Sequence, residues 1–259
     1  MKNQKIAEGS VSHADRREAD LKNEVVKVIP VMERPKIAFV LAIIAGLMNG
    51  YTFQASSVFS TVQSGNIILL GETIATQNWP HFYNILFTVL AFGLGSMFTA
   101  LIEGLSQRAH KGEGNSSNWT FVVIAIEALV LVILASGFFS QYLSVAVICM
   151  IISFVAGMQG NGFHKIKGML YGNVAVTLVV QLAFNYLMQT IRGEKGSLAM
   201  AVMFFSVLLG FGFGGFVGTL ATIKFSELSL LLPAVLLILL MIYLFFVKAD
   251  GKAPIDPTP

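Results

Sequence analysis

Charged residues are scarce in this chain of 259 residues, since Asp, Glu, Lys and Arg together make up 12% of it, whereas a soluble domain has about 25%. The scarcity falls in long runs. Glu127 is the only acid or base between Trp119 and Phe163, and residues 197–223 contain none. Apolar runs of about 20 residues match a hydrocarbon core about 30 Å thick. The sequence therefore excludes an ordinary soluble domain and predicts an integral membrane protein.

Cysteine pairs, histidine clusters and catalytic constellations are also missing. The single cysteine, Cys149, lies in an apolar run, which excludes an intrachain disulfide framework. The four histidines are scattered without the spacing of metal ligands, so we expect no metal and no cofactor. The apolar runs contain no Ser/His, His/Glu or paired-Asp arrangement, and we therefore expect no enzyme. The net charge of +3 comes from bases between the runs, which indicates membrane topology rather than nucleic-acid binding.

Eight apolar segments follow a polar N-terminal tail. The six long ones are about Ile37–Phe53, Phe82–Leu105, Trp119–Phe139, Tyr142–Phe163, Leu198–Ile223 and Leu228–Val247. The two weaker ones are about Ser64–Thr76 and about Asn173–Ile191. The pattern predicts an all-α fold, a polytopic bundle of membrane helices.

Basic residues decide between two topologies. If all eight segments cross the membrane, Arg108, Lys111, Lys165 and Lys167 lie outside; if only the six long ones cross, these bases lie inside. The positive-inside rule therefore predicts about six transmembrane helices, two re-entrant half-helices and both termini in the cytoplasm. The segment Asn173–Ile191 is long enough to cross by itself, so its topology stays open.

Two stretches of the chain have similar patterns. Residues 45–75 and 156–183 each begin with Ala-Gly-apolar, continue with small and amide residues, and contain a Gly-Asn pair before a second apolar segment. FGLGS at 92–96 is echoed by FGFGG at 211–215. Because the second half then enters from the opposite side, we predict an inverted repeat. The predicted units are a flexible cytoplasmic tail (1–35), two membrane repeats (36–140 and 141–248) and a short polar tail (249–259).

The motifs AGLMNGYTF, TVQSGNIILLGETIA, AFGLGSMFTALI, FVAGMQGNGF and YGNVAVTLVVQLA together resemble the YoaK-like family of uncharacterised bacterial multi-pass membrane proteins, catalogued as DUF1275 or UPF0700. The resemblance extends from about Ile37 to Val247. It implies about six membrane spans in a bacterial inner membrane and no particular substrate. The chain departs from the family at Tyr171-Gly172-Asn173, where members often carry Thr-Gly or a similar small polar pair.

Amides and small residues near the two breaks are the candidate solute-binding residues. The start of a half-helix offers free N–H groups and the positive end of the helix dipole, although Ser64 or Asn66 could instead only cap the helix. Amides at membrane depth face a polar cavity or bond between helices, and Thr177 and Gln181 are expected to face the same interior. The candidates are Asn49, Gln54, Gln63, Ser64, Gly65, Asn66, Gln159, Asn161, Tyr171, Gly172, Asn173 and Thr177.

Glu127 is the only acid well inside a long predicted span. A carboxylate at that depth is costly when charged, so it could carry a proton and couple transport to a proton gradient. The alternative is that Glu127 bonds a neighbouring helix or reaches the interface. Glu72 and Glu103 lie closer to the segment ends and are weaker candidates.

Paired, interrupted segments in two halves are typical of transporters. The sequence therefore predicts a secondary transporter or permease in a bacterial cell membrane, with a small polar or anionic solute bound near the membrane midplane. The alternatives are a channel-type pore, or a membrane scaffold or sensor that acts through the N-terminal tail. The expected partners are the lipid bilayer and the solute, and a homo-oligomer stays open.

Overall fold

The computed structural model describes residues 29–109, 119–250 and 253–257. The regular secondary structure of the described part is helical apart from one small hairpin, so the all-α prediction is confirmed. The helices are α2 (Pro35–Ser56), α3 (Gln63–Ala75), α4 (Trp79–Ala109), α5 (Trp119–Ala135), α6 (Val145–Gly162), α7 (Thr177–Ile191), α8 (Ser197–Phe225) and α9 (Leu231–Asp250). Short 3-10 turns are η1 (Val31–Glu33), η2 (Phe139–Gln141) and η3 (Ser226–Leu230), and the hairpin pairs β1 (Lys165–Ile166) with β2 (Met169–Leu170).

Four apolar helical stretches are long enough to cross a membrane: Pro35–Ser56, Trp79–Ala109, Val145–Gly162 and Ser197–Ala249. The last of these contains both α8 and α9, which η3 joins. The helix α5 is apolar but shorter, with 17 residues. These lengths and compositions are those of a membrane protein.

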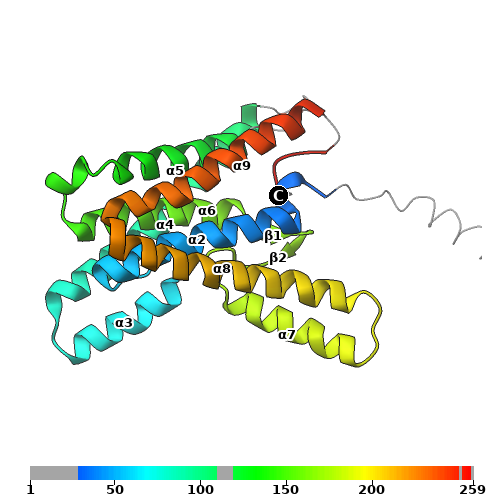
Figure 1. Cartoon of the computed structure of the whole chain (residues 1–259), viewed down its shortest axis with the longest axis horizontal. Helices are drawn as coiled ribbons and strands as arrows, with labels where there is room; N and C mark the ends of the chain where they lie inside the picture. Colours follow the sequence, from blue (N-terminus) through cyan, green and yellow to red (C-terminus); the bar gives the residue numbers. More distant parts are fainter. Residues whose placement is uncertain (1–28, 110–118, 251–252, 258–259) are drawn as a thin grey trace, which may run out of the picture.

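The two weaker segments form the helices α3 and α7, which are short. They have 13 and 15 residues, and at 1.5 Å per residue they are about 20 Å and about 22 Å long. Both lengths are below the thickness of about 30 Å of the hydrocarbon core. In Figure 1, α3 and α7 lie on the same side of the bundle and slope apart toward its opposite ends.

The helix α7 begins later than its sequence suggests. The segment predicted from Asn173 becomes helical only at Thr177, because the chain first makes a tight turn. A Cβ atom on Gly172 would overlap the carbonyl oxygen of Ala175, so only glycine fits this turn.

The long helices pack in two pairs, and each pair contains one helix from each half of the chain. The helix α2 packs along α8, and α6 packs along α4. A Cβ atom on Gly46 of α2 would overlap the carbonyl oxygen of Phe211 of α8, and a Cβ atom on Gly157 of α6 would overlap that of Phe92 of α4. Both pairs of backbones therefore cross at a distance that only glycine permits.

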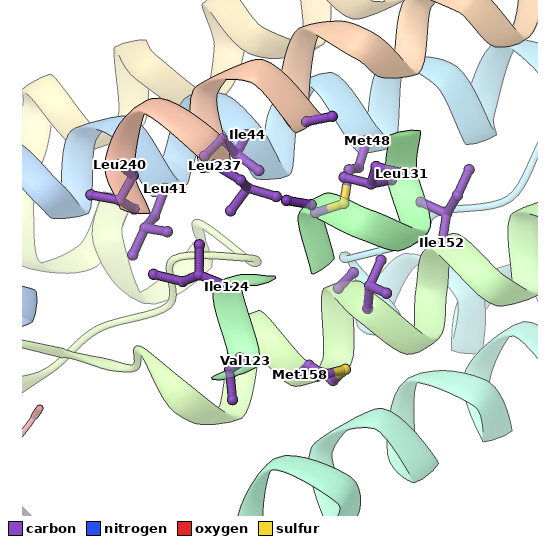
Figure 2. Packing of buried hydrophobic residues seen from close by; sticks show 14 of the residues in the cluster. Leu41, Ile44, Met48, Val123, Ile124, Leu131, Ile152, Met158, Leu237 and Leu240 are labelled. Carbon is purple, nitrogen blue, oxygen red and sulfur yellow. The ribbon is translucent and has the colours of Figure 1, made fainter. Parts of the chain in front are cut away.

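Beside these pairs lie α5 and α9, which contact each other along the top of the bundle in Figure 1. Figure 2 shows the buried cluster at the centre, where side chains of α2, α5, α6 and α9 meet. Among its members, Leu41, Ile124, Ile152 and Leu237 have no exposed surface.

The first and last described segments meet at one end of the bundle, called here the η1 end (Figure 1). The N–H of Val31 donates to the carbonyl of Pro254 at 2.8 Å, and the N–H of Met32 donates to that of Ile255 at 3.2 Å. The N–H of Gly168, in the hairpin turn, donates to Oε2 of Glu33 at 2.6 Å. The start of α2, the hairpin and residues 253–257 thus form one layer.

Parts of the predicted tails therefore belong to the folded body. Residues 1–28 of the predicted N-terminal tail lie outside the described residues, but Val31, Met32 and Glu33 are buried. In the C-terminal tail predicted over 249–259, α9 continues to Asp250 and the side chain of Ile255 is 2% exposed. Apolar side chains and backbone bonds fix both segments, which composition alone does not reveal.

Candidate functional site

The first Gly-Asn pair lies beside a loop that enters the bundle. This loop, residues 57–62, joins α2 to α3, and its Ser60 and Thr61 are buried. Oδ1 of Asn49, on α2, accepts bonds from the N–H of Thr61 at 3.1 Å and from Oγ of Ser60 at 3.3 Å. Nδ2 of Asn49 donates to Oγ1 of Thr61. Asn49 therefore fastens the loop to α2.

Asn66 fastens the same loop to α3. Its Nδ2 donates to the carbonyl of Phe59 at 2.7 Å and to Oε1 of Gln63 at 2.8 Å, while its Oδ1 accepts the N–H of Phe59 at 2.9 Å. We call Asn49, Ser60, Thr61, Gln63 and Asn66 the α3 amide cluster. Each of its five side chains has a hydrogen-bond partner within the chain.

The second Gly-Asn pair has a related arrangement before α7. Nδ2 of Asn173 donates to the carbonyls of Gln159 at 3.2 Å and Phe163 at 3.0 Å, which lie at the end of α6. Nε2 of Gln159 donates to the carbonyl of Leu41, on α2, at 3.1 Å. The Tyr171 ring packs in a cluster with Ala38 and other residues of α2, α7 and α8. We call Gln159, Tyr171 and Asn173 the α7 amide cluster.

The α7 amide cluster differs from the first in its unpaired oxygens. Among the described residues, Oε1 of Gln159, Oδ1 of Asn173 and the hydroxyl of Tyr171 are buried without a hydrogen-bond partner. The amide orientations are fixed, because a backbone carbonyl only accepts and each amide nitrogen must face the carbonyls it contacts. An unsatisfied buried acceptor costs about 1–3 kcal/mol. Three buried oxygens between the end of α6 and the start of α7 thus lack a partner among the described residues.

Glu127 lies in the middle of α5 and is 1% exposed. Neither of its carboxyl oxygens has a hydrogen-bond partner among the described residues. The neighbouring Ile124, Ala128 and Leu131 belong to the central apolar cluster. Within the described residues, Glu127 therefore neither bonds a neighbouring helix nor reaches the protein surface. Elsewhere in the described part, Asn84 and Thr120 also have an unpaired side-chain oxygen.

Comparison with known proteins supplies the family. Residues 37–243 match the family described as "Protein of unknown function (DUF1275)". The chain belongs to the DUF1275 family. Neither a search of curated proteins nor a search of solved structures gave a match.

The start of α3 in this DUF1275 chain differs from the predicted anion site. Ser64 is exposed, and the N-cap of α3 is Val62, without a side-chain cap bond. The N–H of Gln63 donates to the carbonyl of Thr61, and the N–H groups of Gly65 and Asn66 donate to that of Val62. Neither Ser64 nor Asn66 caps the helix, because the amide of Asn66 is used to hold the loop.

Other predicted residues lie apart from the two amide clusters. Gln54 is exposed near the end of α2 and lines a separate cavity of about 400 Å³ with Tyr51 and Glu227. Asn161 is half-buried, and its carbonyl contacts Nδ1 of His164 at 2.6 Å. Thr177 and Gln181 are exposed on α7 and thus do not face the protein interior. Of the two glycines, Gly65 packs against the Phe59 ring and Gly172 makes the turn before α7.

Hydroxyl groups that the sequence pattern does not single out complete these contacts. Oγ of Ser153, on α6, donates toward the carbonyls of Ser60 at 3.0 Å and Thr88 at 2.9 Å, so it joins the 57–62 loop to α4 and α6. Oγ1 of Thr99 donates to the carbonyl of Met158 at 3.2 Å. Serine and threonine inside an apolar run give only a weak signal, because they often bond within their own helix.

Proposed function

We propose that this protein is a secondary transporter or permease for a small polar solute, built from two inverted halves. The observation that carries the proposal is a set of buried, unpaired polar groups between the end of α6 and the start of α7. They are the amide oxygens of Gln159 and Asn173 and the hydroxyl of Tyr171. Broken helices near the midplane are the usual place of a transporter's solute site. Two short helices fit that architecture: α3 has its Gly-Asn pair in the first turn, and α7 has its pair just before its start.

Matched contacts in the two halves support the inverted repeat. The Ala-Gly motif of α2 meets the FGFGG motif of α8, and the Ala-Gly motif of α6 meets the FGLGS motif of α4. The contacts are reciprocal: a Cβ atom on Gly214 would overlap the carbonyl oxygen of Ile43, and one on Gly95 would overlap that of Phe154. Ile43 and Phe154 each precede the motif glycine by three residues. Equivalent residues therefore make equivalent contacts in both halves.

The chemistry of the α7 amide cluster favours a solute with hydrogen-bond donors. Gln159 and Asn173 offer acceptor oxygens, because their nitrogens already bond to backbone carbonyls. At α3, the N–H groups of Gln63, Gly65 and Asn66 are bonded within the chain. The sequence left a polar or an anionic solute open. These contacts favour a neutral polar solute, or one with an ammonium group, over an anionic one.

Glu127 is the group that we propose for proton coupling. It is buried among apolar side chains, and its oxygens have no partner in the described part of the chain. Ionisable residues inside membranes are costly and commonly serve proton relays. A protonated carboxyl that can release its proton to one side would link solute movement to a proton gradient.

A thermal-shift measurement on the purified protein in detergent tests the site. We expect polar solutes with donors, drawn from a panel of amines, polyols, amides and carboxylates, to raise the melting temperature by several degrees, since a ligand at 100 times its Kd stabilises by about 2.7 kcal/mol. The shift should be lost in Gln159→Leu and kept in Gln54→Leu, the matched change at an exposed amide. Equal shifts in both variants would place the solute elsewhere.

The stabilising solute is then supplied to proteoliposomes. A carrier predicts saturable uptake driven by a pH gradient, whereas a channel predicts a flux that rises linearly with concentration. Glu127→Gln should abolish accumulation against a gradient while solute exchange at equal pH continues. Accumulation that survives this substitution would exclude Glu127 as the coupling group.

The proposed orientation places the η1 end in the bacterial cytoplasm, because this end carries Arg34, Lys36, Lys165 and Lys167. We expect a single cysteine at Asn78, in a Cys149→Ala background, to react with a membrane-impermeant thiol reagent on intact cells. A single cysteine at Glu194, exposed in the α7–α8 loop, is the matched control and should react only after the membrane is opened. If the cysteines at positions 78 and 194 both react on intact cells, or if neither does, the prediction that α3 and α7 are re-entrant is wrong.

A further inference from the structure

A groove at the η1 end lies between the first turns of α2 and the face of α9. Its volume is about 710 Å³, and its lining differs along its length. Arg34 and Lys36 lie at one end, beside the start of α2. Leu236 and Leu239 of α9 belong to the apolar remainder of the groove. The groove thus has two cations at one end and an apolar surface along the rest of its length.

The helices α2 and α9 run in opposite directions, so the distance of each lining residue from the η1 end follows from its position along its helix. The helix α2 begins at this end, and α9 approaches it toward Asp250, because residues 254 and 255 bond to η1. Tyr243 therefore lies closer to the cations than Leu236, which is about 10 Å further along α9 at 1.5 Å per residue. A tyrosine at this level is typical of the boundary between headgroups and acyl chains.

We propose that this groove binds an anionic phospholipid, with its phosphate at Arg34 and Lys36 and one acyl chain along Ile37, Val40 and the α9 face. The charge of the two cations complements the phosphate. An acyl chain would cover the apolar lining by van der Waals packing, because the chain already lies in hydrocarbon and leaves no water behind. The site is separate from the amide clusters, so it stands independently of the proposed solute.

The chain's own N-terminal segment is the competing occupant, because residues 1–28 precede the groove in sequence. That segment mixes acids and bases and has few apolar residues in succession. If such a segment filled the apolar part of the groove, it would bury charged side chains, which is costly. The lipid is therefore the occupant that the groove favours.

Native mass spectrometry of the full-length protein in detergent, titrated with phosphatidylglycerol or phosphatidylcholine, tests the proposal. We expect phosphatidylglycerol to bind at lower concentration, and Arg34→Gln with Lys36→Gln to weaken its binding about tenfold or more. The matched control is Arg192→Gln with Lys195→Gln, which removes two exposed cations from the α7–α8 loop and should change binding little. Equal losses in the two double variants would overturn the site in favour of a general surface charge effect.

A second variant separates the apolar part of the site from its charge. Leu239→Trp fills the groove and keeps both cations, so we expect it to weaken phosphatidylglycerol binding as well. Glycerol phosphate, which has the anionic group without acyl chains, should not compete. If it competes fully, or if lipid binds only after residues 1–28 are deleted, the lipid is not the resident occupant and the proposal fails.

Discussion

Replacing Gly157 by alanine is expected to disrupt the bundle, with a loss of about 3 kcal/mol or more in the free energy of unfolding. A Cβ atom at this position would overlap the carbonyl oxygen of Phe92, which is backbone and cannot rotate away. The helices α4 and α6 would have to move apart along their whole contact. Overpacking of a well-packed site commonly costs about 1–3 kcal/mol and sometimes more. The readouts are the melting temperature and the folded fraction on size exclusion in detergent.

Gly93→Ala is the matched control for this prediction. Gly93 lies on α4, near the same crossing, but nothing lies within 4 Å of a Cβ atom there. The same chemical change should be neutral or stabilising by up to about 1 kcal/mol, because alanine favours the helix over glycine. Gly46→Ala, which would overlap the carbonyl oxygen of Phe211, should behave like Gly157→Ala. If Gly157→Ala and Gly93→Ala are equally stable, the close helix crossing is wrong.

The two asparagines of the Gly-Asn pairs are expected to respond differently to alanine. Asn66→Ala removes three hydrogen bonds and leaves the N–H and carbonyl of Phe59 without these partners. We expect a loss of about 2–3 kcal/mol and a lower yield of folded protein. Asn66 is therefore expected to act mainly on folding, and its substitution would reduce transport through the loss of folded protein.

Asn173→Ala is expected to leave the fold largely intact and to abolish solute uptake. The change removes two donated bonds, but it also removes a buried oxygen that has no partner. We expect a cost near 1 kcal/mol, because the lost bonds are partly offset by the unsatisfied acceptor that disappears with them. Melting temperature and uptake per folded molecule, measured on both variants, separate the two effects. Full uptake by folded Asn173→Ala would remove this residue from the solute site.

The sequence by itself determined the class of the protein and the place of its helices. The scarcity of charge and the length of the apolar runs indicate a helical membrane protein, because a helix of about 20 apolar residues spans the bilayer and satisfies its backbone groups internally. Gly65 and Asn66, in the first turn of α3, indicate the interruption of the apolar run, since glycine and amides stand out within such a run. The shortness of α3 followed from the same break. These are local properties, and each depends on neighbours in the sequence.

Only the tertiary structure decided what the polar residues contact. Asn66 and Asn173 follow a glycine in the same way, yet one is fully bonded and the other keeps an unpaired oxygen. The difference arises because the Asn66 oxygen meets the N–H of Phe59, and such a pairing depends on how a loop folds back. In the same way, the groove at Arg34 arises from residues of α2 and α9 about 200 positions apart. Contacts between distant segments are set by packing, which no local pattern encodes.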